Sequence, residues 1–279
     1  MRKFLAVLLS VAMVLGVAGC GSSNSSTKAD DTKDAATTEA ASDIKVGFIF
    51  IGDEIEGYTY AHVIGAKEMQ EALGLSDDQI IYKWNIPENE QCYDAAVDLA
   101  EQGCNIISSN SFGHEDYIIQ AAQEYPDVQF CHATGYKAAS SGLSNMHNYF
   151  TSVYQSRYVS GVVAGMKLAE LYGADTDVKI GYVGAYSYAE VISGFTAYFL
   201  GVRSICPNVT MEVKYTGSWA NQALEKETAE ALIADGCVLI SQHADTTGAA
   251  SACEAAMVYD VGYNVSMMEA APNYALSSA

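Results

Sequence analysis

Short apolar runs alternate with helix-forming segments along most of this chain. Residues 44–51 (IKVGFIFI) form an almost unbroken apolar run, which is typical of a strand buried on both faces of a sheet. Strands separated by helices imply βαβ units and a parallel sheet. In the first half we expect strands at 44–51, 79–84, 104–109 and 128–132, and helices at 59–73, 90–102 and 117–124.

The pattern restarts after residue 151. A long helix is expected over 152–172, and its small residues permit close packing against a neighbour. Two successive α/β units of similar size predict two lobes, 44–150 and 151–262, joined near 133–151. In this second half we expect strands at 178–184, 210–215, 237–242 and 258–262, and helices at 190–206, 221–234 and 248–257.

The N-terminus carries an export signal. A short basic stretch (Arg2 and Lys3) precedes an apolar run over 4–18, and the sequence Val-Ala-Gly-Cys at 17–20 reads as a lipobox. The apolar run is shorter than the roughly 20 residues that a membrane span needs. We therefore expect residues 1–19 to be cleaved as a signal peptide and Cys20 to be lipidated, the alternative being an ordinary signal peptide with a chance cysteine.

Residues 20–43 are predicted to form a disordered tether after the lipidated cysteine. Ser, Thr, Ala, Asp and Lys dominate this segment, which cannot bury enough apolar surface to offset the entropy lost on ordering. Such a tether would hold the folded part outside the cytoplasm, anchored to the cell membrane.

Charge and cysteine content exclude some classes of partner and leave the redox state open. A formal net charge of −20 argues against nucleic acid and anionic lipid as partners. Besides Cys20 the chain has six cysteines, an even number that could form disulfides outside the cytoplasm. Their wide spacing and apolar surroundings favour free, buried thiols instead. They are Cys92, Cys104, Cys131, Cys206, Cys237 and Cys253.

The segments after the expected strands combine aromatic residues with amide, hydroxyl and carboxylate groups. In parallel α/β sheets ligands bind beyond the carboxyl ends of the strands, and two lobes can direct those ends into one cleft. Aromatic faces can stack on a planar ring, while Asn, Asp and Glu hydrogen-bond its polar edge. The alternative is that these aromatic residues only pack the lobes together.

Motifs for catalysis are missing from the sequence. It contains no Gly-x-Ser-x-Gly elbow, no phosphate-binding loop and no Gly-x-Gly-x-x-Gly after the first strand, and its five histidines lack metal-ligand spacing. His243 and Asp245 could form a general base with an orienting carboxylate, but no nucleophile or metal site accompanies them. Glu88 and Glu90 read as solvent-facing. We expect a binding protein with no catalytic residues, no metal and no cofactor.

Several of these segments resemble the basic membrane protein (BMP) family, lipoproteins that serve as solute-binding subunits of ATP-driven importers for purine nucleosides and nucleobases. The resemblance runs from about Lys45 to the end of the chain. It is carried by VGFI (46–49), GYTYAH (57–62), SFG (111–113), FCHATGYK (130–137), SRYVSGVVAG (156–165), EVI (190–192), SW (218–219) and QHAD (242–245).

The resemblance implies a two-lobed type I periplasmic-binding-protein fold, an α/β architecture of parallel sheets flanked by helices. It places Tyr58 where the family stacks an aromatic ring on the base, and Trp219 at the facing position on the other lobe. It also implies an ABC permease as the partner. The remaining positions that it indicates for ligand contact are Phe112, Asp116, Glu190, Asp245 and Asn264.

The chain departs from the family at two places. A family segment of the Gly-x-Asp-x-Asp type is here GYNVS (262–266), so that Asn264 stands where an acidic contact is expected. Family members also continue beyond the equivalent of Ala279, so the C-terminal part looks truncated, and residues 263–279 would begin a return to the first lobe. A missing strand would leave backbone groups and apolar surface uncovered.

These inferences predict an extracytoplasmic lipoprotein that captures a purine nucleobase or nucleoside between two lobes and delivers it to an ABC permease. Three alternatives stay open. The ligand could be a sugar or another small signal molecule, because aromatic stacking serves sugars as well. An exported nucleoside hydrolase would need an acidic cluster, for which Asp53, Glu54 and Glu56 are the candidates. A truncated chain could also have no function.

Overall fold

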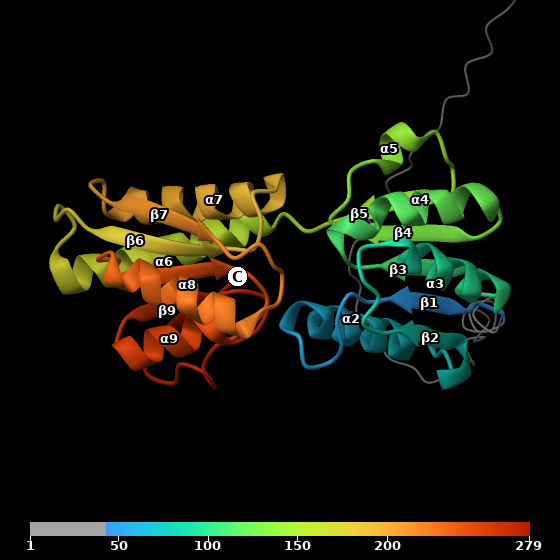
Figure 1. Ribbon diagram of the computed structural model, residues 1–279, viewed down its shortest axis with the longest axis horizontal. Helices are drawn as coiled ribbons and strands as arrows, with labels where there is room; N and C mark the ends of the chain where they lie inside the picture. Colours follow the sequence, from blue (N-terminus) through green and yellow to red (C-terminus); the bar gives the residue numbers. More distant parts are fainter. Residues whose placement is uncertain (1–42) are drawn as a thin grey trace, which may run out of the picture.

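The strand–helix alternation folds into two parallel five-stranded sheets, each in its own lobe. The computed structural model describes residues 43–279, and the lobes lie side by side along its long axis (Figure 1). The predicted signal peptide, lipidated Cys20 and the predicted tether up to residue 42 lie outside the described residues. Within residues 43–279 no helix has the length and apolarity to cross a membrane.

The first lobe holds a sheet in the strand order β2-β1-β3-β4-β5. Its fifth strand was not predicted, because the sequence Met-His-Asn-Tyr lacks an apolar pattern, and the segment was assigned to the connection between lobes. Its elements are β1 (Val46–Ile49), α2 (Gly57–Leu73), β2 (Ile80–Lys83), α3 (Glu90–Glu101), β3 (Ile106–Ser109), α4 (Glu115–Glu124), β4 (Gln129–Ala133), α5 (Ala138–Ser141) and β5 (Met146–Tyr149), with 3-10 turns at Asp77–Gln79 and Phe112–His114.

The second lobe holds a sheet in the order β10-β9-β8-β6-β7, and the chain enters it through residues 150–152. Helices α6 and α7 pack against each other, as do α8 and α9. The elements are α6 (Val153–Tyr172), β6 (Lys179–Gly184), α7 (Ala189–Ile205), β7 (Thr210–Tyr215), α8 (Gln222–Ala234), β8 (Leu239–His243), α9 (Gly248–Ala256), β9 (Tyr259–Gly262) and β10 (Ala275–Ser278).

The last residues correct one expectation. Residues 263–279 do not begin a return to the first lobe, because β10 pairs in parallel with β9 in the second sheet. The turn before β10 buries Met267 and Ala271 against Ala250 of α9. This apolar contact holds the segment against the second lobe.

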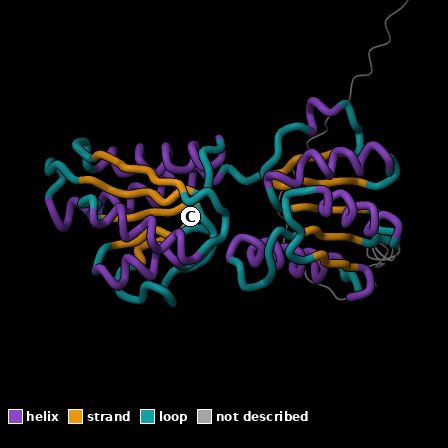
Figure 2. Tube along the Cα trace, viewed as in Figure 1, coloured by secondary structure: helices purple, strands orange, loops and turns teal. Residues whose placement is uncertain are grey.

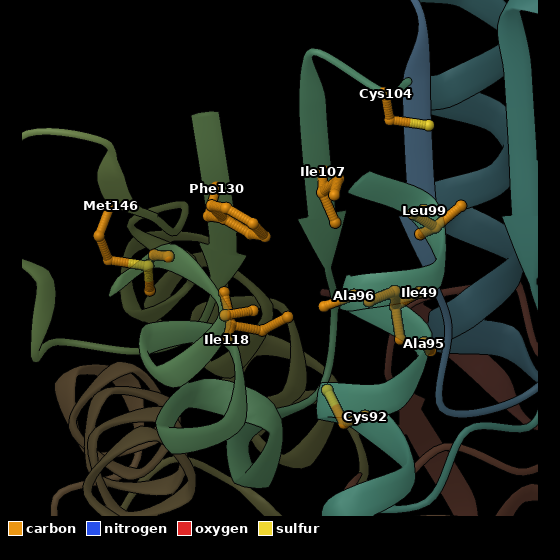
Figure 3. Close-up of a cluster of buried hydrophobic side chains, with 12 residues drawn as sticks. Ile49, Cys92, Ala95, Ala96, Leu99, Cys104, Ile107, Ile118, Phe130 and Met146 are labelled. Carbon is orange, nitrogen blue, oxygen red and sulfur yellow. The ribbon is translucent and has the colours of Figure 1, made fainter. Parts of the chain in front are cut away.

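One cluster of buried side chains forms the core of the first lobe between the sheet and helices α3 and α4 (Figure 3). Ile49, Ile107 and Phe130 come from three neighbouring strands and meet Leu99 and Ile118 from the helices. These three strand residues point to the face of the sheet that α3 and α4 cover.

The small residues predicted to permit close helix packing do so between α6 and α7. A Cβ atom added to Gly161 would lie 2.1 Å from the carbonyl oxygen of Tyr198, and one added to Gly201 would lie 2.2 Å from that of Tyr158. Backbone therefore meets backbone at this crossing, and any side chain would push the helices apart. All six cysteines within the described residues are free thiols, as their wide spacing favoured.

Candidate ligand-binding site between the lobes

A small cavity of about 20 Å³ lies between the lobes, lined by residues that follow the carboxyl ends of strands from both sheets. Figure 2 shows the loops at these strand ends gathered where the lobes face each other. The position matches the rule for parallel α/β sheets, in which ligands bind beyond the strand ends. The lining residues are Ile51, Tyr58, Asn110, Ser111, Phe112 and Thr134 from the first lobe, and Glu190, Trp219, Asp245 and Tyr263 from the second.

Helix α2 presents Tyr58 to the pocket from the first lobe. Glu56 caps this helix, and its carboxylate accepts hydrogen bonds from the backbone N–H of Tyr58 (2.5 Å) and of Thr59 (2.8 Å). The Tyr58 hydroxyl donates to the carbonyl oxygen of Asn110 at 2.5 Å. Burial raises the pKa of Tyr58 well above its ordinary value, so the phenol stays protonated. The hydrogen bond of its hydroxyl group holds the ring in place.

The loop after β3 brings Phe112 to the pocket and is held from two sides. Glu88 accepts from the Ser111 hydroxyl and from the Gly113 N–H, both at 2.7 Å. His132 Nε2 lies 2.7 Å from the Ser111 carbonyl oxygen. Glu88 is exposed, as the sequence indicated. Its two hydrogen bonds nevertheless order the backbone around Phe112.

Thr134 follows β4 with φ at +69°, a backbone conformation that β-branched residues rarely adopt. Its hydroxyl oxygen is buried and has no hydrogen-bond partner within the described residues. Outliers of this kind collect at binding sites, where the surrounding structure enforces them.

In the second lobe Glu190 begins helix α7 and lines the pocket. Its Oε1 lies 3.4 Å from Nε2 of the fully buried His243, while Oε2 is buried without a partner within the part of the chain described. Burial raises the pKa of Glu190 to about 7, against the opposing effect of the positive charge on Arg157. At neutral pH this carboxyl can therefore accept or donate a hydrogen bond.

The loops after β7 and β8 bring Trp219 and Asp245 together. The Asp245 N–H donates to the Trp219 carbonyl oxygen at 2.8 Å. Gln242 fixes the same turn through hydrogen bonds to the carbonyl oxygens of Ala244 and Thr246, both at 2.7 Å. The indole Nε1 of Trp219 is buried with no acceptor in residues 43–279, so its N–H is available to a ligand.

Asn264 supports Asp245 rather than lining the pocket. Its amide donates to Asp245 Oδ1 at 2.9 Å. Its φ of +62° lies in the left-handed region, which Asn tolerates well among residues with a side chain. An aspartate here would set two carboxylates side by side, so the neutral amide fits this chain's arrangement.

The two lobes touch across the mouth of the pocket. The rings of Phe112 and Tyr188 stack across the gap with centroids 4.9 Å apart and planes 24° apart. On another side a Cβ atom added to Gly57 would lie 3.1 Å from Val265 and 3.3 Å from the Asp245 carbonyl oxygen. The lobes therefore touch each other on two sides of the pocket.

The structure places the predicted site residues in two groups. Tyr58, Phe112, Glu190, Trp219 and Asp245 line the pocket, but Asp116 and Asn264 do not.

Asp116 corrects a prediction. It lies on the solvent side of α4 and pairs with Lys137 at 2.6 Å, while its neighbour Glu115 is the buried residue. The two carboxylates are adjacent on a helix, so one turns inward and the other outward. Which one turns inward does not follow from their position after a strand.

Sequence reasoning did not single out five of the lining residues. Asn110 and Ser111 directly follow β3, Thr134 follows β4 and Tyr263 follows β9. The position just after a strand was the signal that could have found them. Ile51 ends the first predicted strand and gave no polar signal. The five are Ile51, Asn110, Ser111, Thr134 and Tyr263.

The acidic segment proposed for a hydrolase does not form a metal site. Asp53, Glu54 and Glu56 border an outer groove between the lobes. Glu56 is committed to capping α2, and Glu54 pairs with Lys67 at 3.0 Å. Within residues 43–279 no group of three His, Cys, Asp or Glu side chains is arranged to hold a metal ion.

Known proteins resemble this chain in sequence and in fold. A purine-binding protein of Brucella abortus is 34% identical over 236 residues, which cover 84% of this chain and 64% of that protein. A Haloferax volcanii protein, named provisionally as an ABC transporter glucose-binding protein, is 28% identical over 260 residues, or 92% of this chain and 63% of that protein. The chain thus spans less than two thirds of the length of these curated relatives.

An ABC transporter solute-binding protein from Conexibacter woesei superposes with a TM-score of 0.60 at 24% identity, covering 78% of this chain and 70% of that one. This likeness concerns the fold. The family model described as ABC transporter substrate-binding protein, PnrA-like, matches residues 50–279. With that match and the 34% identity to the Brucella protein, the chain belongs to the Bmp family of ABC transporter substrate-binding proteins.

Proposed function

We propose that this protein captures a purine base or nucleoside in the pocket between its lobes and presents it to an ABC permease. The observation that carries the proposal is a pocket between the lobes that is lined by aromatic residues from both, Tyr58 from the first and Trp219 from the second. Glu190 and Trp219 line this pocket, and each has a buried polar atom without a partner among residues 43–279, which a nitrogen heterocycle could supply.

The family and the relatives support this ligand class. The Brucella abortus relative is named for purine binding. Binding without catalysis agrees with the family, whose description is that of a substrate-binding protein. Closing of the lobes around the ligand would bury it and create the surface that a permease recognises.

We further propose that the protein works outside the cytoplasm, tethered through a lipid on Cys20. The basic start, the apolar run and the lipobox motivate this proposal. A Cys20→Ala variant should leave the membrane fraction and appear in the soluble fraction. Retention of that variant in the membrane fraction would contradict the anchor.

The ligand class is tested by thermal denaturation of the full chain with adenine, guanine, hypoxanthine and their nucleosides, with ribose and glucose as comparison ligands. Binding to the native state alone stabilises it by about 2.7 kcal/mol at a ligand concentration of 100 times Kd. We expect purines to raise the melting temperature, Tyr58→Ala and Trp219→Ala to abolish the rise, and Tyr58→Phe, which keeps the ring, to retain it.

A sugar is the second candidate, because the Haloferax volcanii relative is named for glucose. A rise in melting temperature with glucose or ribose but not with any purine would replace the purine proposal by the sugar one. No rise with any of these ligands would contradict both.

A further inference from the structure

The two oxygens of the Glu190 carboxyl group lie in different surroundings. Oε1 is 3.4 Å from Nε2 of His243, whereas Oε2 is buried and has no hydrogen-bond partner among residues 43–279. Leaving a buried carboxylate oxygen unpaired costs stability, unless a ligand supplies the missing donor. The carboxyl group lines the pocket. The unpaired oxygen is therefore the acceptor that the site offers.

His243 is held so firmly that it can act as a fixed support. It ends strand β8 and is fully buried. Its ring packs on Tyr263 with centroids 4.2 Å apart, and a Cβ atom added to Gly194 of α7 would lie 2.7 Å from its Nδ1. The glycine in α7 thus makes room for the imidazole ring between helix and sheet.

Charged and polar groups surround this pair: the Tyr263 side chain hydrogen-bonds the Glu190 carboxyl group, and burial, together with the charge of Glu190, raises the pKa of Asp245. Burial, followed by the nearby positive charge of Arg157, lowers the pKa of His243 well below its ordinary value, so the imidazole is neutral. Arg157 itself lies over the ring of Tyr263, 4.3 Å from its centroid, and its Nη1 is directed at the Gly262 carbonyl oxygen at 3.5 Å. Asp260 of β9 is another buried carboxyl group of this lobe, and its oxygens have no partner within the described chain.

We propose that His243 is a positioning residue, which holds Oε1 of Glu190 so that Oε2 faces the ligand. Oε2 then accepts a hydrogen bond from the ligand. The pair selects a planar nitrogen heterocycle whose edge carries an N–H donor. This inference rests on the proposed function and specifies which edge chemistry the second lobe recognises.

The test is isothermal titration of the full chain with adenine and with hypoxanthine, for the wild type and four variants. His243→Phe keeps a ring but removes the nitrogen, and should weaken binding by about 10- to 100-fold, as expected for a hydrogen bond to a charged group. His243→Gln restores an N–H near the position of Nε2 and should bind within a few fold of the wild type. Glu190→Gln tests the acceptor itself.

Protonation of Glu190 removes the acceptor, so affinity in the wild type should fall as the pH drops below about 7. Glu190→Gln should be weaker than the wild type at high pH and independent of pH. This readout separates a positioning role from a merely structural one, because a packing defect would not change the pH profile.

Val202→Ala supplies the matched control. Val202 is fully buried in the same lobe and belongs to a core cluster that includes neither Glu190 nor His243. This variant should melt at a lower temperature but bind with unchanged affinity.

Equal affinity of wild type and His243→Phe would overturn the positioning role, as would a loss in Val202→Ala as large as that in His243→Phe. Failure of His243→Gln to bind better than His243→Phe would do the same. If the wild type bound neither base, the proposed ligand class itself would fall, and with it this inference.

Discussion

The strand ends of the first lobe and those of the second face one pocket, but their buried charged groups are paired differently. In the first lobe Glu115 accepts from the Lys137 N–H (2.7 Å) and from the Asn148 amide (3.0 Å), and His132 lies 2.7 Å from the Ser111 carbonyl oxygen. The buried polar atoms that stay unpartnered in its described residues are the hydroxyls of Tyr82, Ser109 and Thr134 and one ring nitrogen of His114.

The second lobe leaves charged groups without partners. Oε2 of Glu190, both oxygens of Asp260 and two nitrogens of Arg157 are buried and unpaired among the described residues. Since an unpaired buried charge is costly, such groups are retained where a ligand or ordered water completes them. The difference teaches that the first lobe pairs its buried charged groups internally, while the second keeps several of them unpaired.

The largest expected effect comes from adding one methyl group to each lobe at matched glycines. A Cβ atom at Gly135 would lie 2.2 Å from Nδ1 of His132 and 2.3 Å from Oε1 of Glu115, both already hydrogen-bonded. Gly135→Ala should therefore cost about 3 kcal/mol of unfolding free energy. Urea denaturation measures this loss.

The matched change in the second lobe is Gly194→Ala. Its Cβ atom would meet Nδ1 of His243 at 2.7 Å, and that nitrogen has no partner within residues 43–279. The clash therefore breaks no hydrogen bond at Nδ1, and alanine favours helix α7 over glycine by up to about 1 kcal/mol, which offsets part of the cost of displacing the ring. We expect a small change in stability and a weaker affinity for purines. Equal losses of stability in the two variants would break the contrast between the lobes.

A second effect is an opposite response to pH. In the first lobe burial lowers the pKa of His62 and of His114 to about 4, and it also lowers that of His132. The unfolded chain then binds more protons than the folded chain between about pH 4 and 6.5. The stability of the first lobe should rise as the pH increases through this window.

In the second lobe burial raises the pKa of Glu190, Glu225 and Asp260 to about 7. The folded chain then keeps protons that the unfolded chain has released above its ordinary carboxyl pKa, near 4. The stability of the second lobe should therefore fall as the pH increases from about 4 to about 7. Glu56 in the first lobe and His243 in the second are shifted in the opposing sense and reduce the difference.

The two tryptophans separate these responses, because Trp84 follows β2 in the first lobe and Trp219 lies in the second. Urea unfolding at pH 5 and pH 7 is followed by fluorescence in Trp219→Phe, which reports the first lobe, and in Trp84→Phe, which reports the second. Both variants shifting in the same direction with pH would contradict the prediction.

The smallest effect concerns the contact that joins the lobes. The stacked rings of Phe112 and Tyr188 are expected to contribute about 0.5–1.5 kcal/mol beyond their buried area. Phe112→Ala and Tyr188→Ala should each weaken ligand binding by a few fold, and the double variant should lose less than the sum, with Tyr188→Phe as the control that keeps the ring. Strictly additive losses would mean that the stack does not hold the lobes closed.

The pattern of the sequence fixes the order of elements, because it depends on local periodicity. The apolar run at 44–51 contains β1, and the small residues of 152–172 do pack α6 against α7. The segment at 146–149 shows the limit. Its polar residues form a strand only because the exposed edge of β4 offers backbone partners, which a local pattern does not contain.

The site was predictable to the level of loops but not of individual side chains. Tyr58, Glu190 and Trp219 follow strands or begin helices, and that position alone brings them to the pocket. Whether Glu115 or Asp116 turns inward depends on how α4 packs on its sheet. The Glu190–His243 pair joins residues 53 positions apart.

The sequence by itself therefore determined that this chain forms two α/β lobes and that aromatic and polar residues cluster at their strand ends, since both follow from the order of residue types. Only the tertiary structure decided that residues 263–279 stay with the second lobe, that Asn264 supports Asp245 and that Oε2 of Glu190 is left for a ligand. The physical reason is that pairing of buried polar groups depends on distances between elements far apart in the chain, and these are set when the sheets and helices pack.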